Sequence, residues 1–224
     1  MKTDKELGLK VKDHLIKIGI ETPLKDNELS VKELDEKKSI IKKSMEDIMK
    51  VLALDLEDDS LKETPSRIAK MYLEEIFIGL DYENFPKATT VDNKMHYNEM
   101  VTENNVTISS TCEHHFVSID GVAHISYIPK NKVLGLSKLN RIANFFARRP
   151  QIQERLTVQI GETLKYILDT DDVAVVVDAV HFCVKSRGIK DQNSSTVTSF
   201  LSGNYRTNPE TRQEFMAIVN KTKK

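Results

Sequence analysis

The sequence predicts an α+β protein: a four-stranded antiparallel sheet of order ββααββ with two helices packed on it, preceded by an N-terminal helical region. Two observations predict this class. Apolar residues recur at helical spacing through the first ~90 residues, and runs rich in β-branched residues then flank two further helical stripes. We therefore divide the chain into a helical region, residues 1–93, and a sheet-containing domain, residues 94–224.

Three helices are predicted in the N-terminal region. The first spans residues 7–18, where apolar side chains recur every three or four positions. A second apolar stripe, from Ile41 to Leu52, predicts the next helix. The third has terminal signals as well, since Thr64 suits an N-cap, Pro65 the first helical position and Gly79 a C-terminal stop.

Strands and then a helix pair are predicted next. Residues 94–128 have β character, with a hairpin turn expected at Asp120–Gly121. In the helix pair, Ser137 is the expected cap of the first helix and Pro150 ends it. The second helix carries a regular apolar stripe from residue 152 to 167.

The C-terminal part is predicted to return to the sheet. Residues 172–180 are the strongest strand signal in the chain, and further strands are expected at 181–186 and 197–201. A short helix with a Lys-rich tip is expected after Asn208. Such a sheet leaves edge strands exposed, and we expect several copies to join their sheets into a barrel that covers them.

Composition excludes several classes of protein. The formal net charge is −1, and aromatic residues make up 6% of the chain with no Trp, so nucleic-acid binding is not expected. No apolar run is long enough to span a membrane, and the charged N-terminus lacks the apolar segment of a secretory signal. We expect a cytoplasmic protein whose two cysteines are free rather than paired.

Two short motifs concentrate the reactive side chains. Cys112 and His115 have the C-x-x-H spacing of a metal-binding turn, with His114 between them. His181 and Cys183 are two apart on a predicted strand, so both would project from one face. Three of these five groups would complete a Cys-His-Cys zinc site with one position open for water, and would leave two histidines for proton transfer.

Spacing alone leaves the nature of this site open. A catalytic zinc ion (Zn²⁺) with three protein ligands, a structural zinc ion with four, and cysteines and histidines that bind no metal all agree with it. A structural-zinc module without turnover would have no use for unligated histidines, which favours the catalytic alternative.

A second set of residues could bind an anion and a base. Ser137, Lys138 and Arg141 open a predicted helix, where free N–H groups and the helix dipole favour a phosphate. No P-loop motif is present, so a nucleotide would be held by side chains and helix ends. The carboxylate of Glu154 could accept hydrogen bonds from N1–H and the 2-amino group of guanine. The alternative for each basic residue is an ordinary solvated surface charge, and for Glu154 an acid favoured at a helix start by the dipole.

Four strings of the chain resemble the GTP cyclohydrolase I family in its bacterial form. They are TPSRIAKMYLEEIFIGL, STCEHHFVSIDGVAHISYIP, GLSKLNRIANFFARRPQIQERLT and HFCVKSRGI, in this order along the chain. The resemblance implies the tunnelling fold for the catalytic domain, GTP as substrate, and a homodecamer, a dimer of pentamers, with active sites at subunit interfaces. The alternative is another tunnelling-fold enzyme that acts on a pterin or a deazapurine.

The resemblance also implies a reaction and a role for each site residue. The guanine imidazole ring is opened, C8 leaves as formate, and an Amadori-type rearrangement and reclosure give 7,8-dihydroneopterin triphosphate, the first step of folate and tetrahydropterin synthesis. Zinc is implied at Cys112, His115 and Cys183, and proton transfer by His114 and His181. Substrate binding is implied for Glu154 and Gln153 on the guanine and for Ser137, Lys138, Arg141, Arg187 and Arg67 around the triphosphate.

Overall fold

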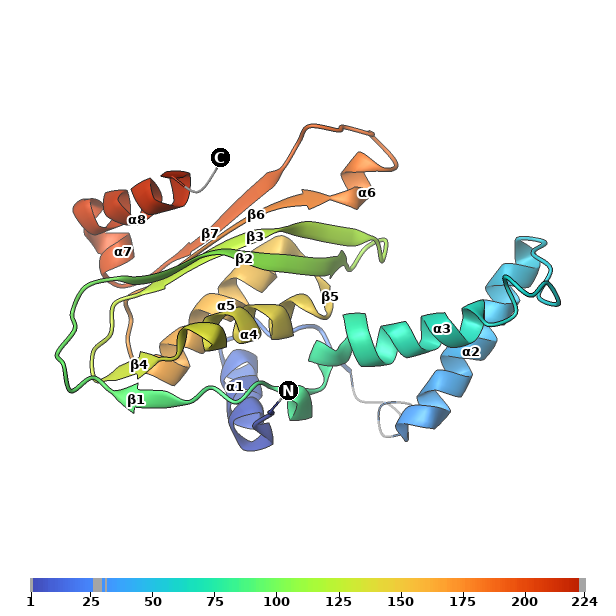
Figure 1. The fold of residues 1–224 in the computed structure, drawn as a ribbon, viewed down its shortest axis with the longest axis horizontal. Coiled ribbons are helices and arrows are strands. Elements are labelled where there is room, and N and C mark those ends of the chain that lie inside the picture. Colours follow the sequence, from blue (N-terminus) through green and yellow to red (C-terminus); the bar gives the residue numbers. More distant parts are fainter. Residues whose placement is uncertain (1, 26–29, 31, 222–224) are drawn as a thin grey trace.

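A five-stranded sheet is the centre of the fold in the computed structural model, which describes residues 2–25, 30 and 32–221 (Figure 1). The strand order is β5-β2-β3-β6-β7, and the four longer strands pair antiparallel. The predicted antiparallel ββααββ arrangement is therefore confirmed. The strands are β2 (Val101–Cys112), β3 (Ser118–Tyr127), β5 (Pro150–Gln151), β6 (Val173–His181) and β7 (Thr196–Leu201).

Helices pack on both faces of the sheet, and alternate residues of β6 contact the helices of one face or the other. Val175 and Val177 belong to the main core beneath α4 and α5, whereas Ala174 and Val176 pack against the C-terminal helices. This alternation has the period of two that a strand imposes. Burial of one such valine stabilises the fold by ~1.5–3 kcal/mol. The helices are α4 (Leu136–Ala147), α5 (Gln153–Leu168), α7 (Asn204–Thr207) and α8 (Pro209–Lys221).

The N-terminal region is helical, as the apolar stripes predict. Val11 and Leu15 on α1 are completely buried and join the main core. By contrast, α2 and α3 contact each other and project away from the sheet in Figure 1. The elements are α1 (Lys5–Lys17), α2 (Leu34–Val51), α3 (Thr64–Met71), the π-helical turn η1 (Tyr72–Ile76) and the 3₁₀ turns η2 (Ile78–Leu80) and η3 (Tyr82–Asn84).

Two of the predicted helix caps are wrong. Thr64 is the first residue of α3 rather than its cap, and Ser137 lies within the first turn of α4, whose cap position is Gly135. Neither helix has a side-chain cap hydrogen bond, because each begins one or two residues earlier than the capping signal suggests. Gly79 also does not end a regular helix: it lies in η2, where an added Cβ would stand 2.1 Å from the carbonyl oxygen of Phe145.

The predicted hairpin turn is wrong as well. Asp120 and Gly121 lie inside β3 and pair with β2, and the turn between these strands covers residues 113–117. Glycine is required at position 121 for a different reason, since a Cβ there would lie 2.1 Å from the carbonyl oxygen of Asp178 on β6. The close approach of two strands has the same sequence signature as a turn. Residues 94–100 precede β2, which begins at Val101.

The strand predicted at residues 181–186 is also not observed. His181 is the last residue of β6, and the chain then forms the one-turn helix α6 (Phe182–Lys185). The strands predicted at 172–180 and 197–201 correspond to β6 and β7. A helix follows Asn208 as predicted, while the Lys-rich tip at 222–224 lies outside the described residues.

A small second sheet joins the two regions of the chain. β1 (Thr90–Asp92) pairs antiparallel with β4 (Lys132–Leu134), directly before α4. The domain boundary placed between residues 93 and 94 stays a prediction. Within the described residues, no helix combines the length and the apolar character that a bilayer crossing requires.

Arg149, directly before β5, forms hydrogen bonds with residues of the N-terminal region. Its side chain is fully buried, and its guanidinium donates to Glu21 at 2.9 Å and to Thr22 at 3.2 Å. It also donates to the carbonyl oxygen of Gly79. These hydrogen bonds of the two terminal nitrogens, with the ion pair to Glu21, offset the cost of burying the guanidinium, while its Nε has no hydrogen-bond partner among the described residues. The segment that leads into β5 and α5 is thereby held in place.

Candidate metal-centred active site

The turn after β2 is held by three backbone hydrogen bonds. Cys112 donates to the carbonyl of Val117 at 2.8 Å and accepts from the N–H of Phe116 at 2.9 Å. Glu113 donates to the carbonyl of Gln151 at 3.0 Å, which continues the pairing of β2 with β5. Cys112 is therefore buried at the end of the strand, while the two histidines that follow are exposed on the turn.

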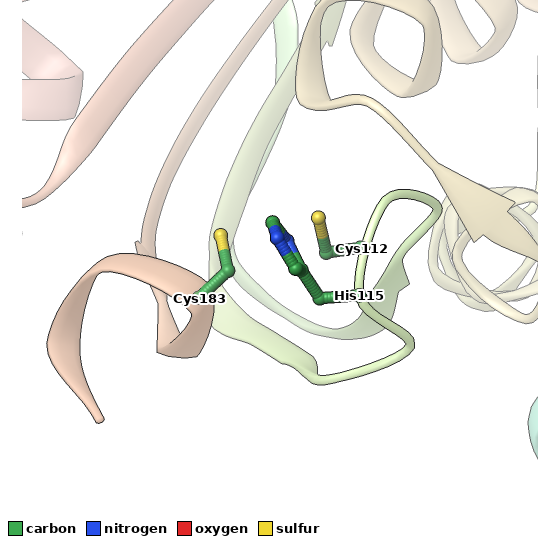
Figure 2. A group of neighbouring side chains, drawn as sticks. All are labelled: Cys112, His115 and Cys183. Atoms are coloured by element: carbon green, nitrogen blue, oxygen red, sulfur yellow. The ribbon is translucent and has the colours of Figure 1, made fainter. Parts of the chain in front are cut away.

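Cys112, His115 and Cys183 converge on one point. Their ligand atoms all lie within 4.8 Å of one another, and Figure 2 shows both sulfur atoms and the imidazole turned toward a common space. Ligand atoms around a tetrahedral zinc ion lie ~3.5–3.8 Å apart, so this set fits zinc after a small contraction. Thiolate and imidazole are the donors that zinc prefers, and three of them leave a fourth position open.

Cys183 reaches this point from α6 rather than from a strand. The predicted strand would have placed His181 and Cys183 on the same face, but His181 is the last residue of β6 and Cys183 belongs to the helical turn that follows, so strand alternation does not apply to the pair. Burial raises the pKa of the Cys183 thiol, and its neighbour Cys112 raises it further. Two thiols so close together need a positive charge between them before both can ionise, and a divalent cation supplies it.

His114 lies on the exposed side of the same turn. Its Nδ1 is 3.8 Å from the sulfur of Cys112, and its ring centroid is 6.4 Å from that of His115. It is therefore beside the Cys-His-Cys cluster without being part of it. This is the arrangement that a proton-transfer residue next to a metal requires.

His181 lies at the end of β6 and is held by the first residue of α5. Its Nε2 is 2.7 Å from Oε1 of Gln153. Burial lowers the pKa of His181, and the nearby carboxylate of Glu154 partly opposes the shift. The carboxylate of Glu154 is therefore close enough to His181 to interact with it electrostatically, although Glu154 is exposed within this chain.

An ion pair that the sequence analysis missed supports the turn. Arg155 donates to both carboxylate oxygens of Glu113, at 2.7 Å and 3.3 Å. These hydrogen bonds lower the pKa of Glu113. The pair links the residue after Cys112 to the first turn of α5. In sequence it could have been suspected only from an acid inside the C-x-x-H motif, because nothing local indicates its partner.

Aromatic side chains pack against the other side of the turn. The Phe116 ring lies 5.3 Å from that of Phe77 and 6.4 Å from that of Tyr72, measured between centroids. Phe116 also has a positive φ of 52°, which is unusual for a residue with a side chain. Arg67 lies on α3, one to two turns before Tyr72, so its helix leads to this side of the cluster.

The remaining predicted cations are divided between two places. Arg187 is exposed four residues after Cys183 and interacts electrostatically with it. Lys138 and Arg141, in contrast, flank Asn140, which donates to Glu103 near the start of β2 at 3.0 Å. Glu103 is nine residues from Cys112 on this strand, roughly 30 Å at the rise of an extended chain. Ser137, Lys138 and Arg141 therefore lie at the opposite end of the sheet from the cysteine cluster of the same chain.

Comparison with known proteins gives a consistent result. The family model of GTP cyclohydrolase I matches residues 41–220. The GTP cyclohydrolase 1 of Aliivibrio salmonicida is 54% identical over 98% of this chain and 100% of its own length. Those of a Shewanella species and of Vibrio campbellii are 54% and 55% identical over 94% and 92% of this chain and 97% and 94% of their own lengths.

Among solved structures, that of an archaeosine synthase QueF-Like in the apo form is a much weaker match. It is 18% identical, with a TM-score of 0.40, over 47% of this chain and 94% of its own.

Proposed function

The chain belongs to the GTP cyclohydrolase I family, and from this membership we propose how its residues convert GTP to 7,8-dihydroneopterin triphosphate and formate. The observation that carries the proposal is the convergence of two thiols and one imidazole, with His114 beside them and His181 two residues before Cys183. When bound at Cys112, His115 and Cys183, zinc would lower the pKa of a water toward ~7 at the open position.

The two unligated histidines move the protons of ring opening. His114 and His181 exchange protons with N7 and N9 of the guanine as the bonds from these nitrogens to C8 break. One water adds to C8 in ring opening, and a second releases C8 as formate. The ribose then opens, rearranges and recloses on the exposed amines with loss of water, which requires no redox cofactor.

Guanine is selected at the start of α5. The carboxylate of Glu154 accepts hydrogen bonds from N1–H and the 2-amino group, a donor pair that adenine lacks. Glu154 lies beside His181, whose pKa it raises, so a purine held there has its imidazole ring near the proton-transfer residues. The exposure of Glu154 in the single chain leaves its oxygens free for this contact.

The triphosphate is held by Ser137, Lys138, Arg141, Arg187 and Arg67. Because the first three lie on the part of α4 whose Asn140 bonds to Glu103, at the other end of β2 from Cys112 of their own chain, they serve a cluster on another chain. We therefore infer a homo-oligomer, a decamer built as a dimer of pentamers, with each active site between subunits. The thiol ligands must stay reduced, which agrees with a cytoplasmic location.

A turnover assay with GTP tests the reaction. Purified protein loaded with zinc should release formate and form a product with pterin absorbance, and a parallel metal analysis should find zinc bound. Removal of the metal by a chelator should abolish turnover, and added zinc should restore it. Protein that binds zinc but releases no formate from GTP would refute the proposed reaction.

Mixing two variants, each assayed alone and together at a GTP concentration far below the raised KM of Lys138→Ala so that neither alone turns over measurably, tests the shared site. Cys112→Ser and Lys138→Ala damage opposite halves, so unfolded, mixed and reassembled chains should recover about a quarter of wild-type activity if each site takes one half from each of two chains. Sites built within one chain would recover nothing. Light scattering of the wild type gives the oligomer size independently.

A further inference from the structure

Gln153 holds His181 in a network whose direction is set by the backbone. Its side chain is 1% exposed at the start of α5. Its Nε2 lies 3.0 Å from the carbonyl oxygen of Val177, 2.8 Å from that of Thr196 and 3.1 Å from Oγ1 of Thr198. Carbonyl oxygens only accept hydrogen bonds, so the amide nitrogen must face them and the amide cannot be flipped.

The orientation of this amide determines the tautomer of His181. With the nitrogen turned to β6 and β7, Oε1 is the atom that faces His181 Nε2, at 2.7 Å. An amide oxygen only accepts, so Nε2 must carry a hydrogen. In the neutral imidazole the other nitrogen, Nδ1, is then unprotonated and able to accept a proton.

We propose that Gln153 is a positioning residue that fixes His181 in its Nε2–H form, so that Nδ1 is the atom that exchanges protons with the substrate. This rests on the proposed function for the identity of the reaction, while the tautomer rests on the hydrogen bonds alone. It replaces the expectation that Gln153 contacts guanine. Both amide hydrogens of Gln153 are used by β6 and β7, and its side chain is buried under His181.

Kinetics of three variants test this assignment. Gln153→Leu removes the acceptor, and kcat should fall about 100-fold because the imidazole loses its fixed tautomer and orientation. KM for GTP should stay within about twofold, since no substrate contact is lost. Gln153→Glu keeps an oxygen that accepts from Nε2–H and, as a buried protonated acid, donates to one carbonyl, so kcat should return to within about tenfold of wild type.

Gln159→Leu is the matched control. Gln159 is also a buried, hydrogen-bonded glutamine on α5, but it bonds to Ile20 and Gln151 rather than to a site residue. It should lower the melting temperature about as much as Gln153→Leu and leave kcat unchanged. An unchanged kcat in Gln153→Leu, a loss that appears in KM instead, or a Gln153→Glu variant as slow as Gln153→Leu would each overturn the proposal.

Neutron diffraction of deuterium-exchanged crystals decides the tautomer without turnover. Deuterium should be found on Nε2 of His181, pointing at the Gln153 oxygen. A bare Nε2 would overturn the assignment. If the wild-type enzyme released no formate from GTP, the proposed reaction would fail, but this measurement would still decide the tautomer, so the two failures are distinguishable.

Discussion

The two ends of the central sheet differ in whether their polar and charged side chains have partners within the same chain. At the end of β2, Cys112 is buried, Glu113 is paired with Arg155, and His181 is bonded to Gln153. At the opposite end, Ser137 is exposed and the described residues offer no ion pair to Lys138 or Arg141. One end is organised before any ligand arrives, whereas the other presents cations without partners.

This difference separates two tasks that the site must perform. Metal ligands and proton-transfer groups must be held within a fraction of an ångström, so they need buried hydrogen bonds around them. Cations that hold a flexible triphosphate need only to be near it and free of competing carboxylates. In the proposed oligomer each chain supplies its two halves to different sites, and so meets both demands without placing unpaired charge inside its own core.

Loss of a metal ligand should have the largest effect at the organised end. Cys183→Ser should release zinc and lower kcat by about 10⁴-fold or more, because the reactive water is lost with the ion. Metal analysis and formate release measure the two effects. Ser186→Ala, on the segment that follows α6, is the control and should keep both zinc and activity. A Cys183→Ser enzyme with stoichiometric zinc and normal turnover would exclude this residue as a ligand.

Loss of a proton-transfer group should have the next largest effect. His181→Ala should lower kcat by about 10³-fold while zinc remains bound, since the role proposed for this residue is to move protons and not to bind metal. GTP binding, measured by equilibrium dialysis, should persist. If the variant lost its zinc instead, His181 would belong to the metal ligands and not to the proton-transfer residues.

Substitutions at the end of the sheet that carries Lys138 should change the KM for GTP and leave kcat unchanged. Lys138→Ala should raise KM for GTP about 10- to 100-fold, with zinc content unchanged, because a charge-assisted contact to phosphate is lost. Lys130→Ala, an exposed lysine before β4, is the matched control. Equal KM values for the two variants would identify Lys138 as an ordinary surface charge.

The smallest effect is expected for the ion pair behind the turn. Arg155→Met should lower the free energy of unfolding by about 1 kcal/mol, as for a partly buried bidentate pair. Because Arg155 lowers the pKa of Glu113, this contribution is present above the ordinary carboxyl value near 4.5 and is lost as the pH falls through the lowered value. Unfolding curves of wild type and variant should therefore converge in acid. A difference that persisted in acid would have another origin.

The sequence determined the elements and the chemical groups. Apolar periodicity predicted α1, α2, α4 and α5, and a run of β-branched residues predicted β6, because these signals are local and many buried side chains contribute to them. The C-x-x-H motif predicted a metal site for a similar reason, since its two ligands lie within one turn. Prediction failed where one local signal has two possible causes. A glycine after an aspartate can mark a hairpin turn or a close contact between strands, and at position 121 it marks the strand contact.

Only the tertiary structure decided which groups meet. Cys112 and Cys183 converge although 70 residues separate them, and α6 rather than a strand brings the second thiol into place. The bond from Gln153 to His181 depends on the register of β6 and β7, and the distance of Lys138 from its own cysteine cluster depends on the direction of α4. Such contacts join segments that share no local pattern, so they follow from the packing of the whole chain.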